Sequence, residues 1–572
     1  MMKLKLYITM ILTSILSVGF LYAQELKPFK YKVGIIGNPG NPDVRYDEMQ
    51  LTALKKLGFN TLQLNIAWGS RPGDEALNLE DVLYVPGYGE QSAVEKRLKE
   101  LKRRAIIAKK HGFRTIFHFG APKIDSLYKI NHIAASIDRE TEENSIQKKE
   151  IVSKYVELLT RLAKEVPEVD DILLYTFDQE AWVANEFGNG PTDKDQPLHE
   201  RLPAFLTAMT EAWTNSKPNG TVWWEPWELS AGQIYACIPN LPTHHFGLSL
   251  HSNIAEVQAT RPVDIWLKNM VNILAEKKIP VIGEIFMASA NEEVEPLQHF
   301  AAPRLVFDQL QSMYGLKGLS GVKEYYGLLP DSYDPSLRLA GLKLQKPTIS
   351  LEKALSVLSK DFKGAEEIVL KAWEASARGM ELFPWDATWN FRRLPKRGHV
   401  FHTFARAGIP GRVAISPSWM STRKSLFMIT TNEPLDPWFY EDIELRCRAA
   451  EEQFSIALSQ YRLLKSAMTG NPEMVKYIDK VLPDIELFNQ SVVALKCYTR
   501  EANLAFLMRK YAKDGKDIPM DLIRRFRAVM DEDIANQKKG LTENTKNVPT
   551  AEEMLRSFNN SPEKWVMKYL LH

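Results

Sequence analysis

Cysteine is scarce in this sequence, which has only Cys237, Cys447 and Cys497 in 572 residues. Because these three lie far apart in the chain, they match neither a disulfide framework nor a Cys-x-x-Cys metal site. Net charge is also nearly absent, since 73 Lys and Arg residues stand against 71 Asp and Glu residues. A chain so balanced has no general attraction for nucleic acid or anionic membrane, and we expect no nucleic-acid partner.

Long uncharged apolar runs are missing outside the N-terminus. Residues 6–22 form the one such run; it follows Lys3 and Lys5 and ends before Ala23, a small residue suited to cleavage. This layout predicts a signal peptide over 1–23, export to a bacterial periplasm, and no membrane contact after cleavage. A single membrane anchor is the alternative, because the run is near the lower length limit of a span.

Several catalytic signatures are lacking too. The sequence has no P-loop, no Gly-x-Ser-x-Gly elbow and no evident Cys/His dyad. Its histidines are scattered and no His-x-His ends the first strand, which argues against a metal-dependent barrel hydrolase. We therefore expect no metal and no cofactor. The overall composition, with 45% hydrophobic and 25% charged residues, is that of an ordinary globular protein.

What the sequence does have is a regular alternation of short apolar runs, rich in β-branched and aromatic residues, with amphipathic helical stretches. The runs predict strands at 33–37, 60–68, 114–120, 171–182, 222–228, 245–251, 280–286 and 319–326. Helices are predicted at 43–57, 95–111, 143–166, 198–216, 263–277 and 302–314. This pattern predicts an α/β fold, a (β/α)8 TIM barrel over 31–327. A doubly wound sheet is the alternative, but the glycines at 34–40 miss the Gly-x-Gly-x-x-Gly spacing.

The alternation stops after residue 327. Pro, Asp and Ser residues predict a linker over 328–349, and an all-α helical C-terminal domain is predicted over 350–572. Its helices are expected at 351–382, 437–468, 472–511, 518–537 and 549–571. Because these helices have many apolar positions, we expect the domain to dock on the barrel. The sequence leaves the oligomeric state open.

Acidic and aromatic residues gather where the predicted strands end, which is where barrel enzymes place their active sites. The candidates that contact substrate are Asp178, Trp68, His118, Trp182, Glu225, Trp227, His251, Glu324 and Tyr325. Sugar rings stack on aromatic side chains and their hydroxyls bind carboxylates, so this set favours a carbohydrate substrate. Cleavage of a glycosidic bond needs two carboxyl groups, one to protonate the leaving oxygen and one to attack the anomeric carbon or activate water.

Two acids occupy the ends of strands that lie across the lumen of such a barrel. Glu180 ends the predicted fourth strand, on one face with Asp178, and we expect Leu174 to continue that face inward. Glu284 ends the predicted seventh strand. A proton donor, Tyr325 or Lys323 from the eighth strand, is expected to keep Glu284 ionised.

This arrangement resembles that of the clan A retaining glycoside hydrolases, of the kind exported by glycan-degrading Bacteroidetes. The resemblance covers the barrel, about half of the chain, and implies Glu180 as acid/base and Glu284 as nucleophile. The clan usually has Asn-Glu at strand four, where this chain has Gln179-Glu180. The Asp178/Glu180 pair is also similar to the adjacent Asp-Glu of β-hexosaminidases. The alternative function is a non-catalytic glycan-binding protein on a hydrolase-like barrel.

Overall fold

The computed structural model of the protein describes residues 26–39, 41, 45–66, 76, 78–122, 145–175, 196–226, 229, 231–252, 259–260, 262–330, 333–385, 414–415, 429–430 and 437–539. The predicted signal peptide (1–23) and the predicted last helix (549–571) lie outside these residues. Within them, no helix combines the length and apolar character needed to cross a membrane.

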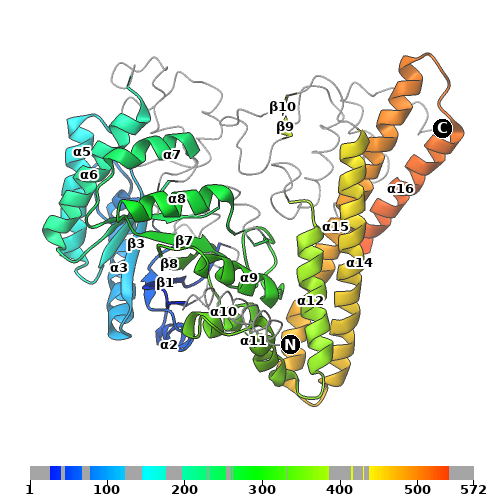
Figure 1. Ribbon diagram of the computed structural model, residues 1–572, viewed down its shortest axis with the longest axis horizontal. Coiled ribbons are helices and arrows are strands. Elements are labelled where there is room, and N and C mark those ends of the chain that lie inside the picture. The colour runs from blue at the N-terminus through cyan, green and yellow to red at the C-terminus, as the bar shows by residue number, and fades with distance from the viewer. Residues whose placement is uncertain are drawn as a thin grey trace, which may run out of the picture.

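Eight parallel strands form a closed barrel in which neighbours follow chain order and β8 pairs with β1 (Figure 1). The strands are β1 (Tyr31–Ile35), β2 (Thr61–Gln63), β3 (Arg114–Gly120), β4 (Asp171–Tyr175), β5 (Val222–Glu225), β6 (Phe246–Leu250), β7 (Val281–Ile285) and β8 (Leu319–Glu324). The predicted TIM barrel is thereby confirmed. Most strands are shorter than predicted at their C-terminal ends, where the chain leaves the sheet to form the rim.

Helices surround the barrel and connect successive strands. They are α2 (Glu48–Lys56), α3 (Gln91–Lys110), α5 (Lys149–Glu165), α6 (Leu198–Ser216), α7 (Ala231–Cys237), α8 (Ile265–Glu276), α9 (Pro303–Tyr314) and α10 (Pro335–Gln345), with short helical turns at Leu79–Asp81 and Ile238–Asn240. Helix α7 was not predicted from the sequence. The prediction of a linker over 328–349 is wrong over α10, which packs against α9 and buries Leu337, Leu339 and Leu344.

The barrel strands contribute to two apolar clusters, one inside the lumen and one between the strands and the surrounding helices. The inner cluster contains Tyr31, Val33, Ile116, Leu173, Tyr175, Trp223 and Ile282, all from strands. Side chains alternate between the two faces of a strand, so residues two positions further along point into the same lumen. Leu174 belongs instead to the outer cluster, beneath the helices. The expectation that Leu174 points inward is therefore wrong, because the strand register places Leu173 and Tyr175 inside.

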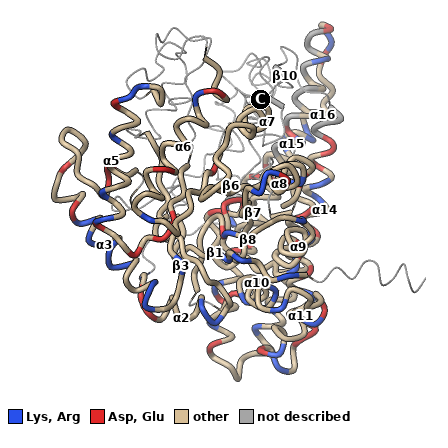
Figure 2. The backbone as a smooth tube through the Cα atoms, turned by 60° about the vertical axis from the view of Figure 1, so that its left-hand side comes forward, with Lys and Arg blue, Asp and Glu red and all other residues tan. Residues whose placement is uncertain are grey.

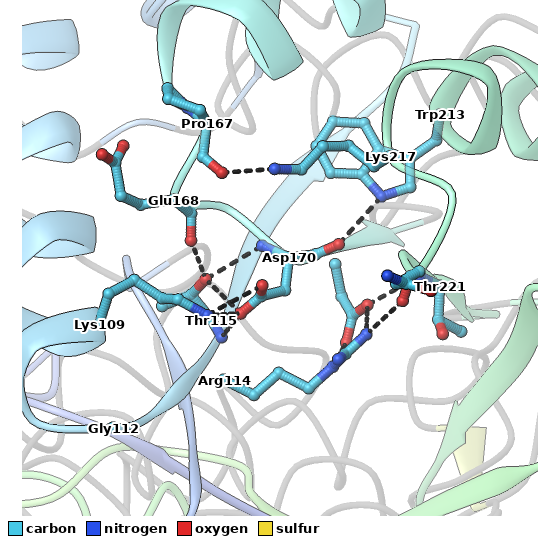
Figure 3. Close-up of polar contacts among 12 residues, drawn as sticks. Lys109, Gly112, Arg114, Thr115, Pro167, Glu168, Asp170, Trp213, Lys217 and Thr221 are labelled. Carbon is cyan, nitrogen blue, oxygen red and sulfur yellow. Dashed lines mark hydrogen bonds and ion pairs between the residues drawn. The ribbon is translucent and has the colours of Figure 1, made fainter.

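The N-terminal end of the barrel is closed by a polar network that ties β3 to β4 and β5 (Figure 3). Arg114 donates two hydrogen bonds to the buried Asp171 carboxylate, at 2.6 and 2.5 Å. The Thr221 N–H donates to the same carboxylate at 2.7 Å, and the Lys109 ammonium pairs with Asp170 at 2.9 Å. Burial disfavours the Asp171 charge and raises its pKa, and the bidentate pairing with Arg114 opposes part of that rise. The network is structural, at the end opposite to the candidate site.

The C-terminal part is a bundle of long helices beside the barrel (Figure 1). It contains α12 (Glu366–Leu382), α14 (Pro437–Ala467), α15 (Pro472–Lys513) and α16 (Met520–Lys539), and the shorter α11 (Leu351–Ser359) precedes it. The predicted helix over 351–382 is broken between α11 and α12, where Gly364 adopts a positive φ of 84°. Both signs of charge occur along the outer helices (Figure 2), in line with the formal net charge of +2.

The bundle docks firmly on the barrel, as expected. Phe300, in the loop between β7 and α9, packs edge-on against Phe454 of α14 and at a tilt against Phe488 of α15. Asp484 of α15 accepts hydrogen bonds from the backbone N–H groups of Gln298 and His299, at 2.9 and 2.6 Å. One continuous apolar core runs through both parts. The bundle thus supports the loop that follows the β7 strand end.

Candidate active site

Strand alternation brings four chemically active side chains into the lumen above the apolar inner cluster. His118 lies two residues beyond Ile116 on β3, and Glu225 lies two beyond Trp223 on β5. Glu284 lies two beyond Ile282 on β7, and it is directly paired in register with Lys323 on β8. All four are almost completely buried, with relative exposures of 0 or 1%. These strand ends therefore form a compact polar layer on an apolar floor.

Lys323 is the hub of this layer. Its ammonium donates to Glu284 Oε1 at 3.0 Å and lies 3.6 Å from Glu225 Oε2. The Ser249 hydroxyl of β6 also donates to Glu284 Oε1, at 2.5 Å. Ser249 shares the inward face with Gly247, where an added Cβ would lie 2.4 Å from the Trp223 ring. The expectation that Lys323 or Tyr325 supplies a donor to Glu284 is thereby confirmed for Lys323.

Glu284 is held in its ionised form. Burial alone would raise its pKa, but the nearby charges of Lys323 and His251 and the hydrogen bonds from Ser249 and Lys323 outweigh burial and lower it. The same attraction acts on the cation, because the charges of Glu225 and Glu284 overcome burial and raise the pKa of Lys323. A carboxylate that stays charged at neutral pH is what a nucleophile requires.

Glu225 differs from Glu284 although the two are neighbours. Burial and the negative charge of Glu284 raise the pKa of Glu225 well above its ordinary value, and Lys323 only partly opposes them. Both carboxyl groups lie within 3.6 Å of the Lys323 ammonium. His118 Nε2 lies 3.6 Å from Glu225 Oε2, and the His118 ring stands edge-on to Tyr175. His118 is thus part of the polar layer.

His251 and Tyr325 lie at the rim beside this layer. The Tyr325 ring is packed edge-on between the rings of His251 and Phe286, with centroid separations of 5.8 and 5.6 Å. The Lys323 ammonium is 5.9 Å from the Tyr325 ring centroid. These contacts connect the predicted residues His251 and Tyr325 to Glu284 through Lys323.

Glu324 has a different setting from the other candidates. Its carboxylate accepts backbone hydrogen bonds from Met287 at 2.7 Å, Tyr326 at 2.9 Å and Gly327 at 3.1 Å. Burial raises the pKa of Glu324 to about 7, although these hydrogen bonds oppose the rise. Glu324 therefore fixes the loops after β7 and β8.

The remaining predicted site residues lie outside the described residues. These are Trp68, Asp178, Glu180, Trp182 and Trp227. Their roles, including that of Glu180 as acid/base, remain predictions. Among the residues that the structure does describe, no three His, Cys, Asp or Glu side chains group as metal ligands would.

Ser249 was not predicted as a site residue, and Lys323 was predicted only as one of two possible donors to Glu284. A usable signal was present in both strands. Lys323 is a charged residue inside an apolar strand, where burial is costly without a partner. Ser249 interrupts the apolar run of β6 on the same face as Gly247. The register between the strands places Lys323 and Ser249 beside Glu284, and this register cannot be read from the sequence.

No protein-family model and no curated protein sequence matches this chain. Solved structures do resemble it. A GH138 enzyme targeting the pectin rhamnogalacturonan II superimposes with a TM-score of 0.59 at 14% identity, covering 95% of this chain and 67% of that one. PbGH5A, a family 5 glycoside hydrolase from Prevotella bryantii B14 in complex with a xyloglucan oligosaccharide, has a TM-score of 0.35 at 14% identity over 56% of this chain and 98% of its own.

Endo-glycoceramidase II from Rhodococcus sp. has a TM-score of 0.34 at 13% identity, covering 55% of this chain and 79% of that one. The likeness to the GH138 enzyme extends through the barrel and into the helical part, because it covers nearly the whole chain. At this level of identity the likeness concerns the fold. It confirms that the chain has the fold of a barrel glycoside hydrolase, as the resemblance implied.

Proposed function

We propose that this protein is a glycoside hydrolase that cleaves a glycosidic bond in an oligo- or polysaccharide with retention of configuration. The observation that carries the proposal is that Glu284 is buried and ionised. This carboxylate ends β7 inside the barrel, is buried, and is kept ionised by Lys323 and Ser249. The glycoside hydrolase fold of the GH138 enzyme supports the same reading by analogy.

Glu284 would act as the nucleophile. Its carboxylate attacks the anomeric carbon and forms a covalent glycosyl-enzyme, while the glycosidic C–O bond breaks and the leaving oxygen takes up a proton. Water then attacks the same carbon, and Glu284 leaves as a carboxylate. Lys323 and Ser249 hold one carboxylate oxygen, so the attacking group is oriented before substrate arrives.

Glu180 is the acid/base of this proposal, because its place in the sequence after β4 matches that of the acid/base in the clan that the chain resembles. In a retaining reaction its carboxyl would lie about 5–5.5 Å from that of Glu284. Glu180→Gln should slow hydrolysis of substrates with poor leaving groups far more than that of activated aryl glycosides. Equal losses on both substrate types would move the acid role to another residue.

The function is tested by incubating purified protein with a panel of aryl glycosides and native oligosaccharides, with the product anomer followed by NMR. We expect hydrolysis of at least one glycoside, with the first-formed product retaining the anomeric configuration. Glu284→Gln should abolish that turnover on every substrate. Binding of oligosaccharide with no hydrolysis by the wild type would refute the proposal and favour a glycan-binding protein.

The proposal includes export through the signal peptide over 1–23 and a periplasmic location. The intact mass of the protein recovered from its native host tests this point. A mature form that begins near residue 24 agrees with the proposal, and a chain that begins at Met1 refutes it.

A further inference from the structure

We propose that Glu284 attacks through Oε2 and that the two donors to Oε1, Ser249 and Lys323, accelerate the second step, in which Glu284 leaves the sugar. This inference rests on the proposed function, because it divides the two steps of that reaction between the two oxygens of one carboxylate. Ser249 is then a positioning residue, since its hydroxyl acts through the nucleophile.

The two oxygens of Glu284 have different surroundings. Oε1 accepts a hydrogen bond from the Ser249 hydroxyl at 2.5 Å and one from the Lys323 ammonium at 3.0 Å. Oε2 is buried as well, yet no N–H group and no Ser, Thr or Tyr hydroxyl among the described residues donates to it. A buried acceptor without a donor is uncommon in proteins and points to a functional role. Oε2 can therefore bond to the anomeric carbon without first losing a hydrogen bond, whereas Oε1 cannot.

The barrel strands hold the two donors in place. Ser249 lies on β6 and Lys323 on β8, so the donors approach Glu284 from the strands on both sides of β7. Glu284 is paired in register with Lys323, and Ser249 is paired with Ile282, two residues before Glu284. Because the donors belong to strands and not to loops, we expect them to keep their positions when substrate enters. A half-turn of the carboxylate only exchanges its two oxygens, so one oxygen is held and the other is free in either case.

The two steps change the charge on this carboxylate in opposite directions. In the first step the bond from Oε2 to the anomeric carbon forms, the glycosidic C–O bond breaks, the leaving oxygen takes a proton from the acid, and Glu284 loses its charge. In the second step a water oxygen bonds to the same carbon and its proton goes to the base, while the electron pair of the Oε2–carbon bond returns to Glu284. Donors to Oε1 stabilise the charged carboxylate more than the neutral ester. They therefore favour the second step and not the first.

Ser249→Ala separates the two steps, because Lys323 remains to keep Glu284 ionised. The assay is pre-steady-state hydrolysis of an activated aryl glycoside of the hydrolysed sugar, at the pH optimum of each variant. For such a leaving group kcat/KM reports the first step and kcat the second. We expect kcat to fall by about 10- to 100-fold, as is typical for loss of a hydrogen bond to a charged group, and kcat/KM by less than about 3-fold. A burst of aryl product equal to the enzyme concentration should accompany the loss. Equal losses of kcat and kcat/KM without a burst would overturn the inference.

Reactivation of the trapped enzyme measures the second step alone. The protein is labelled with an activated 2-deoxy-2-fluoro glycoside, and the return of activity is followed after the excess reagent is removed. Reactivation should be about 10- to 100-fold slower in Ser249→Ala than in wild type. Equal rates would refute the role of the Oε1 donors. A wild type that never labels on Glu284 would contradict the proposed function itself, so the two failures are distinguishable.

A crystal structure of the labelled wild type tests the choice of oxygen. The sugar should be bonded to the Glu284 oxygen that Ser249 and Lys323 do not contact, and both donors should lie within hydrogen-bond distance of the ester carbonyl oxygen. A sugar bonded to the contacted oxygen would overturn the inference and leave the proposed function standing.

Ser376→Ala is the matched control. Ser376 is an equally buried serine of α12, and its hydroxyl donates to the Ala372 carbonyl group at 3.0 Å. This variant should keep the kcat, the kcat/KM and the reactivation rate of the wild type. A burst and a slow reactivation in Ser376→Ala as large as those in Ser249→Ala would show that the loss of any buried hydroxyl has this effect, and would refute the specific role of Ser249.

Discussion

Lys323→Met removes the only cation that contacts both buried carboxyl groups among the described residues and should shift the pH dependence of catalysis. At the observed 3.0 Å from Glu284 and an effective dielectric constant of about 20, the lost attraction is about 5.5 kcal/mol. At 1.36 kcal/mol per pKa unit this is an upper limit of about 4 units. Since relaxation and water reduce the effect, we expect the pKa of Glu284 to rise by about 2–4 units.

The assay is kcat/KM as a function of pH on a hydrolysed aryl glycoside. The nucleophile must be ionised, so the acid limb of the profile should move to higher pH by about the same 2–4 units. Because the pKa of Glu284 starts below its ordinary 4.5, a rise of this size increases the protonated fraction at pH 7 and lowers kcat/KM there by no more than about 30-fold. Activity should recover in part as the pH is raised.

Lys343→Met is the matched control. Lys343 is an equally buried lysine, but its ammonium donates to the Pro347 and Ile349 carbonyl groups that follow α10. This variant should lose stability and leave the acid limb in place. A folded Lys323→Met protein whose acid limb moves by less than about half a unit would refute the reasoning, because at least about 2 units are expected.

Three further predictions concern the scaffold. Phe488→Ala removes an aromatic ring from the contact between bundle and barrel and should lower the free energy of unfolding by about 3–5 kcal/mol. Denaturant unfolding measures this loss, and a loss below about 1 kcal/mol would contradict the contact. Glu324 has its pKa raised from 4.5 to about 7, so its contribution to stability is fully present below about pH 4.5 and is lost as pH rises through 7. Melting temperatures measured from about pH 5 to 8 should therefore fall less steeply in Glu324→Gln than in wild type, and parallel curves would refute this. Gly321→Ala places a Cβ 2.4 Å from the Tyr31 carbonyl oxygen at the β8–β1 seam and should lower the melting temperature, whereas Gly470→Ala, which meets nothing within 4 Å, should not; equal melting temperatures would refute the clash.

Much of the barrel could be predicted because local signals and packing agree. The periodicity over 114–120 matches β3, and that over 198–216 matches α6, residue for residue. The eighth barrel helix, α10, was missed because Asp334 and Pro335 resemble linker residues. In the structure Asp334 caps the helix by accepting from the Ser336 and Leu337 N–H groups, and Pro335 is its first residue. That pair is a known helix start signal.

The candidate site was only partly predictable. Sequence identifies acids at strand ends but not which face of the sheet each one occupies, and a shift of one residue reverses the face. Leu174 was assigned to the wrong face for this reason. Glu284 and Glu324 both end strands, yet one points into the lumen beside Lys323 and the other binds backbone N–H groups. Only the register of β7 against β8 distinguishes them.

The central claim is that Glu284 is the nucleophile of a retaining glycoside hydrolase. The most direct measurement is covalent trapping with an activated 2-deoxy-2-fluoro glycoside of the hydrolysed sugar, followed by mass spectrometry of the intact protein and of its peptides. The account predicts one added glycosyl group per chain, located on Glu284, and none in Glu284→Gln. A label on another carboxylate, or an active enzyme that releases product of inverted configuration without any label, would contradict it.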